Sequence, residues 1–248
     1  LPTMLPTALR RKLLLLLVPP LWAAYTLSIV DRTNLAVAQL GGANNTAPHG
    51  MGQPPQYGGL GLSQAQFGLA AGVFFAGYST AQVPVLQILV HCGARRVLGL
   101  CTLLTGLCSA ATAFVGGLGS LCVVRLVLGV FEAGMYPGAL YFISTWFPNE
   151  HLGQASSLFV TGAAVGPVLG GGVSGLVMAA LDGDDGWPGW RWLFIIQGVP
   201  TMAIGLLLLL VLPDAPHSCR MLNGDERRAL SAALRSSRAH ASGKTEAE

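Results

Sequence analysis

The chain has 248 residues, of which 52% are hydrophobic and only 10% are charged, and its formal net charge is +3. Because soluble proteins carry about 25% charged residues, this composition excludes a water-soluble enzyme, a disordered chain and a fibrous protein. The basic residues are scattered and do not form the basic patch that is typical of nucleic-acid-binding proteins. The composition predicts an all-α protein that crosses the lipid bilayer several times.

Six apolar stretches predict six membrane-spanning helices. A helix needs about 20 mostly apolar residues to cross the hydrocarbon core. The predicted spans are 13–40, 64–90, 97–117, 120–146, 153–180 and 191–212. We therefore expect a six-helix bundle over residues 1–212 and a cytoplasmic linker or tail over residues 213–248. Within this tail, residues 225–239 fit either a basic amphipathic helix or a partly disordered segment.

The positions of the basic residues predict the orientation of the spans. Cytoplasmic segments of membrane proteins are enriched in Lys and Arg. With both termini in the cytoplasm, the outer loops contain Asp182, Asp184 and Asp185 and no basic residue away from the helix ends. Asn44 begins an N-glycosylation sequon in the first outer loop. The plasma membrane is the default location, and an organelle membrane is the alternative. With both termini in the cytoplasm, the cytoplasmic side contains Arg10, Arg11, Lys12, Arg95, Arg96 and the basic residues of the tail.

Ionisable residues inside the apolar spans are the candidate functional residues, because each costs at least about 2.5–3.5 kcal/mol at the centre of a membrane helix. Arg125 and Glu132 are seven residues apart, so they lie on one face of the fourth span. Asp31 and Arg32 are neighbours in the first span. Both sets are expected to line a transport path. The alternatives are an Arg125–Glu132 pair that only joins helices, and solvation of Asp31 and Arg32 at the outer interface.

The fifth span contains small residues at a spacing of four, which predicts close packing of helices. Pro167 permits a kink, and motion at this kink is an additional possibility. No metal site or cofactor is expected, and no nucleophile–base pair or phosphate loop indicates an enzyme. The packing or hinge residues are Gly162, Gly166, Pro167 and Gly170.

Several motifs follow one another in a fixed order along nearly the whole chain. They include Asp31-Arg32-Thr33-Asn34, Gly93-Ala94-Arg95-Arg96, Arg125-x-x-x-Gly129-x-x-Glu132, Trp146-Phe147-Pro148 and Gly189-Trp190-Arg191-Trp192. In this order they resemble the N-terminal half of a major facilitator superfamily transporter. The sequence is most similar to the anion:cation symporters, which include allantoate, tartrate and hydroxyphenylacetate permeases.

The resemblance implies secondary transport of small organic anions, commonly by proton symport. It implies that Asp31 and Glu132 carry protons, and that Arg32 and Arg125 bind the anion. The family has twelve helices and this chain has six predicted ones, so a complete site would need a C-terminal half or a second copy.

Two alternatives remain open at the level of the sequence. The fifth span also resembles a motif of proton-coupled drug antiporters, which favours a drug or metabolite antiporter. A truncated six-helix membrane protein without transport activity is the other alternative.

Overall fold

A computed structural model describes residues 5–41, 47–219 and 221–245, and this part of the chain is helical, with no strand. The sequon at Asn44 lies outside the described residues. Short 3-10 turns occur at Pro55–Tyr57, Asp184–Gly186 and Pro216–Ser218. The α-helices are α1 (Thr7–Gln39), α2 (Gln64–Cys92), α3 (Ala94–Thr112), α4 (Leu118–Glu132), α5 (Met135–Trp146), α6 (Asn149–Val160), α7 (Gly162–Ala180), α8 (Gly189–Val211) and α9 (Gly224–Thr245).

The described residues contain six helical spans that are long and apolar enough to cross a membrane, which confirms the predicted fold class. The fourth span consists of α4 and α5, and the fifth of α6 and α7. The third span ends at Thr112 rather than at residue 117, because Gly116 and Gly117 have low helix propensity and form the connection to α4. The first helix starts earlier than predicted, at Thr7, since basic residues are good helix formers.

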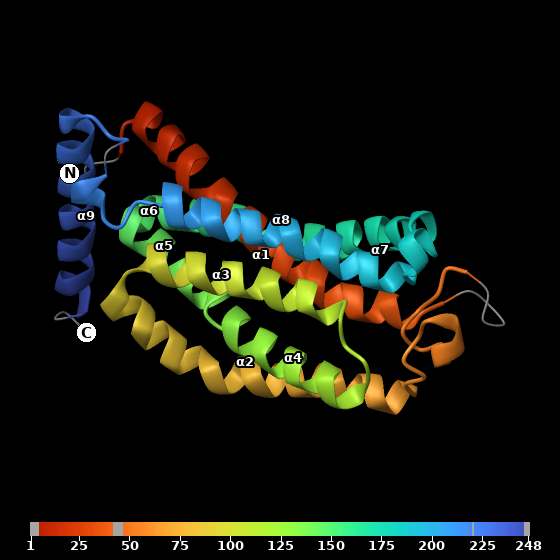
Figure 1. Cartoon of the computed structure of the whole chain (residues 1–248). Coiled ribbons are helices and arrows are strands. Elements are labelled where there is room, and N and C mark those ends of the chain that lie inside the picture. The colour runs from red at the N-terminus through yellow and green to blue at the C-terminus, as the bar shows by residue number, and fades with distance from the viewer. Residues whose placement is uncertain (1–4, 42–46, 220, 246–248) are drawn as a thin grey trace.

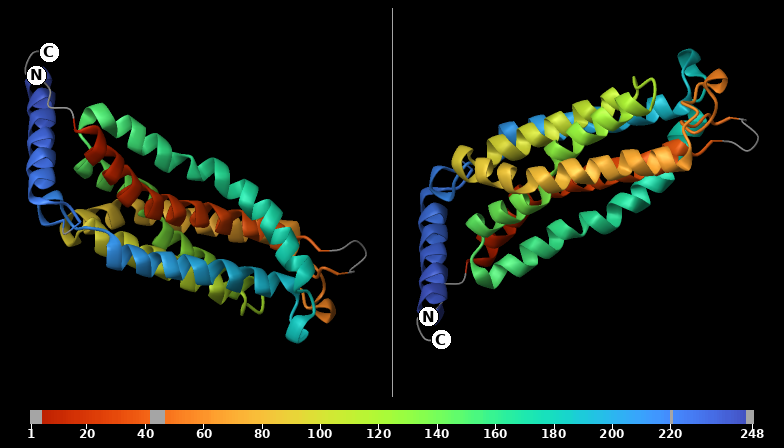
Figure 2. Two further views of the ribbon diagram at one scale, coloured as in Figure 1. Left: turned by 90° about the horizontal axis from the view of Figure 1, so that it is seen from above. Right: turned by 90° about the horizontal axis from the view of Figure 1, so that it is seen from below.

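The spans lie side by side in an elongated bundle, and α9 runs across one end of it (Figure 1). Figure 2 shows the same arrangement from above and below, with the connections between spans gathered at both ends. We call the two ends the α9 end and the loop end; the loop end includes residues 40–41, 47–63 and 181–188. The closest neighbours are α3 with α8, α2 with α4, and α1 with α7.

Small residues on one side of α7 allow this helix to lie close to α1. A Cβ atom added to Gly162, Gly166 or Gly170 would overlap atoms of α1, including the side chains of Ile29 and Thr33. On the opposite side of α7, Gly171 and Gly172 face open space. The four-residue spacing therefore corresponds to one packed face, as in other closely packed membrane helices.

We expect Gly166→Leu to destabilise the bundle and Gly171→Leu to leave it almost unchanged. The leucine at position 166 would collide with Ile29, and overpacking of this kind typically costs about 1–3 kcal/mol. The measurement is thermal unfolding of the purified protein in mild detergent. Equal melting temperatures for the two variants would contradict the assignment of the packed face.

At the loop end, Asp182 joins the connection between α1 and α2 to the connection between α7 and α8. Its Oδ1 accepts hydrogen bonds from the backbone N–H groups of His49 (2.9 Å) and Gly189 (2.8 Å), and its Oδ2 lies 2.6 Å from Nδ1 of His49. Burial of the carboxylate favours its protonated form, but these hydrogen bonds outweigh burial, and the pKa of Asp182 lies below its ordinary value. Asp182 is therefore a polar link between residues 47–63 and 181–189.

Asp182→Ala is expected to destabilise the loop end by about 1–3 kcal/mol, because two backbone donors lose their acceptor. The control is Asp184→Ala, which removes an exposed neighbouring carboxylate. Hydrogen exchange of residues 47–60 provides the measurement. In the unchanged protein, the lowered pKa means that the stabilisation is present above the ordinary pKa of aspartate and is lost as the pH falls below it. Faster exchange in Asp184→Ala than in Asp182→Ala would contradict this role.

Candidate functional site

Two ion pairs connect α1 to α4 inside the bundle. Nη1 of Arg125 lies 3.3 Å from Oδ2 of Asp31, and the hydroxyl group of Ser109 on α3 donates a hydrogen bond to the other oxygen of Asp31. Nε and Nη2 of Arg32 each lie 2.8 Å from Oε2 of Glu132. The four charged residues predicted from the sequence are therefore in one place, and each acid is paired with a base of the other helix.

The observed ion pairs differ from both alternative interpretations of these charges, namely a pair between Arg125 and Glu132 and solvation of Asp31 and Arg32. Arg125 and Glu132 share a face of α4, as their spacing predicts, but each of them binds a residue of α1. Asp31 is only 2% exposed, so it is not solvated at an interface as the alternative interpretation supposes. The side chain of Arg32 is 27% exposed and is the most accessible of the four.

Each of the two guanidinium groups lies near at least one aromatic ring. The guanidinium carbon of Arg32 lies 5.2 Å from the ring centre of Phe74 and 5.0 Å from that of Tyr78, both on α2. Arg125 lies 5.6 Å from the ring centre of Phe194 on α8. Cations at this distance are attracted to the faces of aromatic rings, which fixes the arginines without using all of their hydrogen-bond donors.

Several polar atoms of the site are buried without a hydrogen-bond partner in the described part of the chain. They are Nε and Nη2 of Arg125 and Oε1 of Glu132. A buried donor or acceptor without a partner costs about 1–3 kcal/mol. The site therefore retains donors for an anion and an oxygen atom that can accept a proton.

The structure also reveals polar residues that the sequence analysis missed. Ser109 lies on a polar stripe of α3, and the spacing of three or four residues along this stripe was a signal that could have identified it. Two further helices also bind α1: the hydroxyl of Ser174 on α7 donates to Oδ1 of Asn34 (2.6 Å), and Gln197 on α8 donates to the carbonyl of Leu27. The α3 stripe consists of the buried residues Thr102, Thr105, Ser109 and Thr112.

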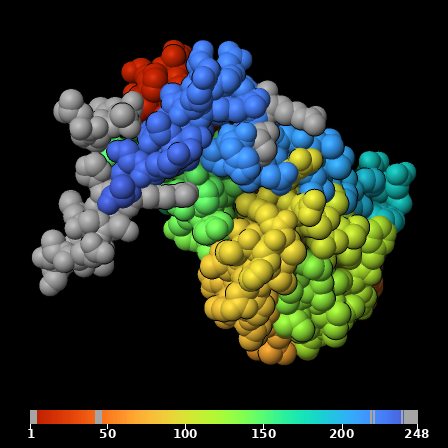
Figure 3. Space-filling view, turned by 90° about the vertical axis from the view of Figure 1, so that its left-hand side faces the viewer, coloured from red at the N-terminus to blue at the C-terminus, as the bar shows by residue number. Residues whose placement is uncertain are grey.

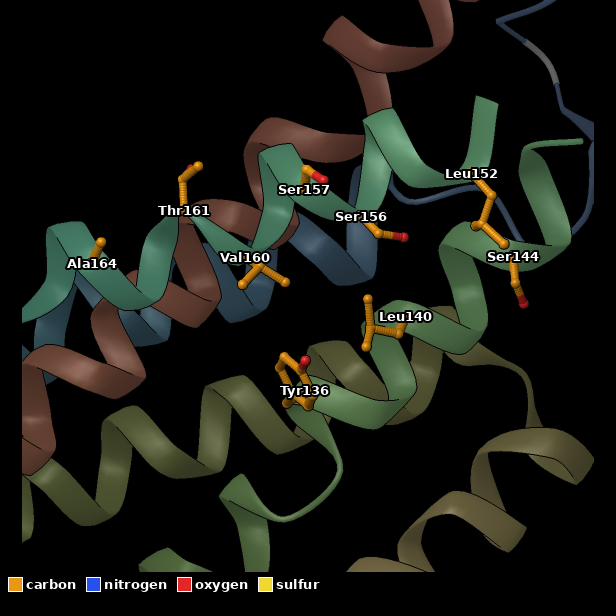
Figure 4. Close-up of a pocket in the computed structure, with 9 residues that line it drawn as sticks. All are labelled: Tyr136, Leu140, Ser144, Leu152, Ser156, Ser157, Val160, Thr161 and Ala164. Atoms are coloured by element: carbon orange, nitrogen blue, oxygen red, sulfur yellow. The ribbon is translucent and has the colours of Figure 1, made fainter. Parts of the chain in front are cut away.

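A groove of about 670 Å³ lies between α5 and the α6–α7 span (Figure 4). Its polar groups are hydroxyls, and none of its lining residues is charged. Tyr136 stands at one end of it and packs against Tyr25 of α1, with 5.5 Å between ring centres. Tyr136 follows Glu132 by four residues, so the groove opens close to the ion pairs. The lining residues are Tyr136, Leu140, Ser144, Leu152, Ser156, Ser157, Val160, Thr161 and Ala164.

Among the described residues, no group of three His, Cys, Asp or Glu side chains could hold a metal ion. In general, an arginine side chain can bind an anion and a carboxylate can bind a proton.

Comparison with known proteins places the chain in a family. A putative tartrate transporter of Agrobacterium vitis is 34% identical over 223 residues, which are 90% of this chain and 48% of that protein. A quinolone resistance transporter of Acinetobacter baumannii is 33% identical over 212 residues, which are 86% of this chain and 45% of that protein. The chain thus spans about half the length of the relatives it matches.

The fold comparison gives the same result. A crystal structure of a bacterial homologue of the human lysosomal transporter Spinster, inward-facing and occupied, superposes with a TM-score of 0.67 and 25% identity. The superposition covers 85% of this chain and 46% of that one. The family model of the Major Facilitator Superfamily matches residues 8–240. The chain is therefore an integral membrane protein that belongs to the Major Facilitator Superfamily, a family of transporters rather than enzymes.

Proposed function

We propose that the protein carries out secondary transport of small organic anions, coupled to the movement of protons in the same direction. The observation that carries this proposal is the pair of crossed ion pairs, Asp31–Arg125 and Arg32–Glu132, with unpartnered polar atoms on Arg125 and Glu132. The similarity to a putative tartrate transporter supports a carboxylate as the substrate.

In this proposal, the charge balance of the site couples the transport of the anion to the transport of a proton. Two arginines and two carboxylates sum to zero, which is the least costly arrangement in a membrane interior. An anion that binds to Arg125 or Arg32 competes with Asp31 or Glu132 for the guanidinium group. The displaced carboxylate restores neutrality by taking up a proton, so the anion and the proton are carried together.

The proposed site is completed by a second six-helix unit, either a C-terminal half or a second copy of this chain. In transporters built from repeats, the substrate site lies near the bilayer midplane, between two units that rock against each other. The exposed apolar side chains of α2 and α7, such as Val83 and Val168, supply surfaces for that unit and for lipid. In this proposal α7 also bends at Pro167, while Gly162, Gly166 and Gly170 keep it packed against α1.

The proposed orientation places both termini in the cytoplasm of a cell whose plasma membrane holds the protein. Arg10, Arg11 and Lys12 in the first turns of α1 and the arginines of α9 lie at the same end of the bundle (Figure 1). This distribution follows the positive-inside rule. A glycan at Asn44 would then lie on the outer side.

The test is uptake of radiolabelled tartrate by right-side-out membrane vesicles that contain the protein in its native assembly. Outside acid is expected to drive accumulation, and an uncoupler that dissipates the pH gradient is expected to remove it. Equal uptake with and without the gradient would contradict proton symport, and absence of carboxylate uptake would contradict the substrate class.

A second candidate function is proton-coupled export of drugs. It is favoured by the similarity to a quinolone resistance transporter and by the Gly162, Gly166 and Pro167 pattern of α7. The same vesicles distinguish it, because an exporter would move a quinolone out of the cytoplasmic side while leaving tartrate uptake at background.

A further inference from the structure

Helix α9 has two chemically different faces. Leu230, Ala233 and Leu234 are buried against the α9 end of the bundle, in the same core as Leu9 and Leu13 of α1. Polar contacts secure this face, since Nζ of Lys12 lies 2.8 Å from Oε2 of Glu226 and the hydroxyl of Ser237 accepts a hydrogen bond from the N–H of Asn149. α9 is thus a docked part of the bundle.

A second face of α9, with the buried Leu234 at its edge, lines a hollow that we call the α9 cleft. One part of it has a volume of about 360 Å³, and the adjoining part, of about 350 Å³, reaches Thr145 near the end of α5. His217, Ser231 and Arg235 line both parts, so the two parts adjoin. Figure 3 shows the end of the molecule across which α9 runs. The residues of the α9 cleft are Thr145, Pro216, His217, Arg227, Arg228, Ser231, Ala232, Leu234 and Arg235.

The α9 cleft carries an excess of positive charge. Arg227, Arg228 and Arg235 contribute three full charges, and no carboxylate is among the lining residues. Arg228 is paired with exposed Asp225 at 2.8 Å, and Arg227 donates to the carbonyl of Leu222. Among the described residues, Arg235 forms no ion pair. The nearby acid Glu226 points the other way, toward Lys12.

We propose that the α9 cleft binds the phosphate headgroup of an anionic phospholipid. The cleft lies beside the end of α5, where a membrane-spanning helix leaves the hydrocarbon core and headgroups begin. Arginine forks and the hydroxyls of Ser231 and Thr145 are suitable donors for phosphate oxygens. Tyr141, one turn before Thr145 and 40% exposed, offers an apolar surface for the acyl chains. Anionic lipids of the cytoplasmic leaflet attract such basic segments.

This inference rests on the proposed orientation of the chain and not on transport, so it is tested by binding alone. The purified protein in mild detergent is titrated with short-chain phosphatidylglycerol or phosphatidylcholine, and binding is measured by native mass spectrometry. Arg228→Gln with Arg235→Gln is the test variant. Arg11→Gln with Arg96→Gln is the matched control, because it removes two exposed charges outside the α9 cleft.

The unchanged protein is expected to bind phosphatidylglycerol in preference to phosphatidylcholine. The test variant is expected to bind phosphatidylglycerol about tenfold more weakly, since each basic residue near an anionic surface contributes to the attraction. The control variant and Arg228→Lys with Arg235→Lys are expected to retain most of the affinity. Unchanged thermal unfolding of the test variant shows that the loss does not arise from misfolding.

Three outcomes would overturn the proposal. Equal weakening in the test and control variants would mean diffuse attraction by the whole basic end. Displacement of the lipid by millimolar inorganic phosphate, with equal affinity for phosphate alone, would mean a site for a soluble phosphate. Equal binding of the two lipids by the unchanged protein would mean that the α9 cleft does not recognise the headgroup charge.

Discussion

Replacing Glu132 with glutamine is expected to abolish proton-driven anion uptake while leaving exchange of anions across the membrane intact. Glutamine keeps an oxygen that can accept hydrogen bonds from Arg32, but it cannot take up or release a proton. The net charge of the site then no longer depends on proton binding at position 132. Accumulation under outside acid is expected to fall to the level measured without a pH gradient.

The measurement compares two assays on the same vesicles: uptake under a pH gradient, and counterflow of labelled against unlabelled anion without a gradient. Glu150→Gln is the matched control, because it removes an exposed carboxylate at the start of α6. Gradient-driven accumulation by the Glu132→Gln variant at the rate of the unchanged protein would contradict the assignment of Glu132 to proton coupling.

Arg125→Gln is expected to remove anion binding and to destabilise the bundle. The substitution leaves Asp31 as an unpaired buried charge, and loss of one partner from a buried ion pair typically costs about 3–5 kcal/mol. It also removes the unpartnered nitrogens Nε and Nη2, which are the donors available to a carboxylate. The temperature of thermal unfolding is expected to fall, and added anion is expected to raise that temperature less than it does in the unchanged protein.

The double variant Asp31→Asn with Arg125→Gln separates these two effects. It removes the ion pair as a unit, and the asparagine side chain at position 31 keeps an oxygen that can accept the hydrogen bond from Ser109. We expect most of the stability to return without anion binding. Anion protection of the double variant at the level of the unchanged protein would show that Arg125 does not bind the substrate.

The spans could be predicted because a membrane interior imposes a simple rule on sequence, namely long stretches without charge. The break at Ala133 and Gly134, which divides the fourth span into α4 and α5, is invisible to that rule because both sides of the break are apolar. The shared face of Arg125 and Glu132 could also be predicted, since it depends only on the geometry of one helix.

The partners of these charges could not be predicted, because they belong to different helices. Asp31 and Arg32 project about 100° apart from α1, so their direction along this helix does not decide which residues they meet. Instead the short aspartate meets the long side chain of Arg125, and the long side chain of Arg32 reaches Glu132 two turns away along α4. Only the relative placement of α1 and α4 decides this pairing.

The neighbours of these two helices give the crossed ion pairs a mechanical consequence. α1 packs mainly against α7 and α8, whereas α4 packs mainly against α2 and α3. α1 and α7 are in close backbone contact through small residues, but α1 and α4 are joined by long charged side chains. A junction made of long side chains can change its length more easily than one made of backbones in close contact, because side chains can rotate about their bonds. The spacing of α1 and α4 is thus held by charged side chains and not by direct contact between their backbones.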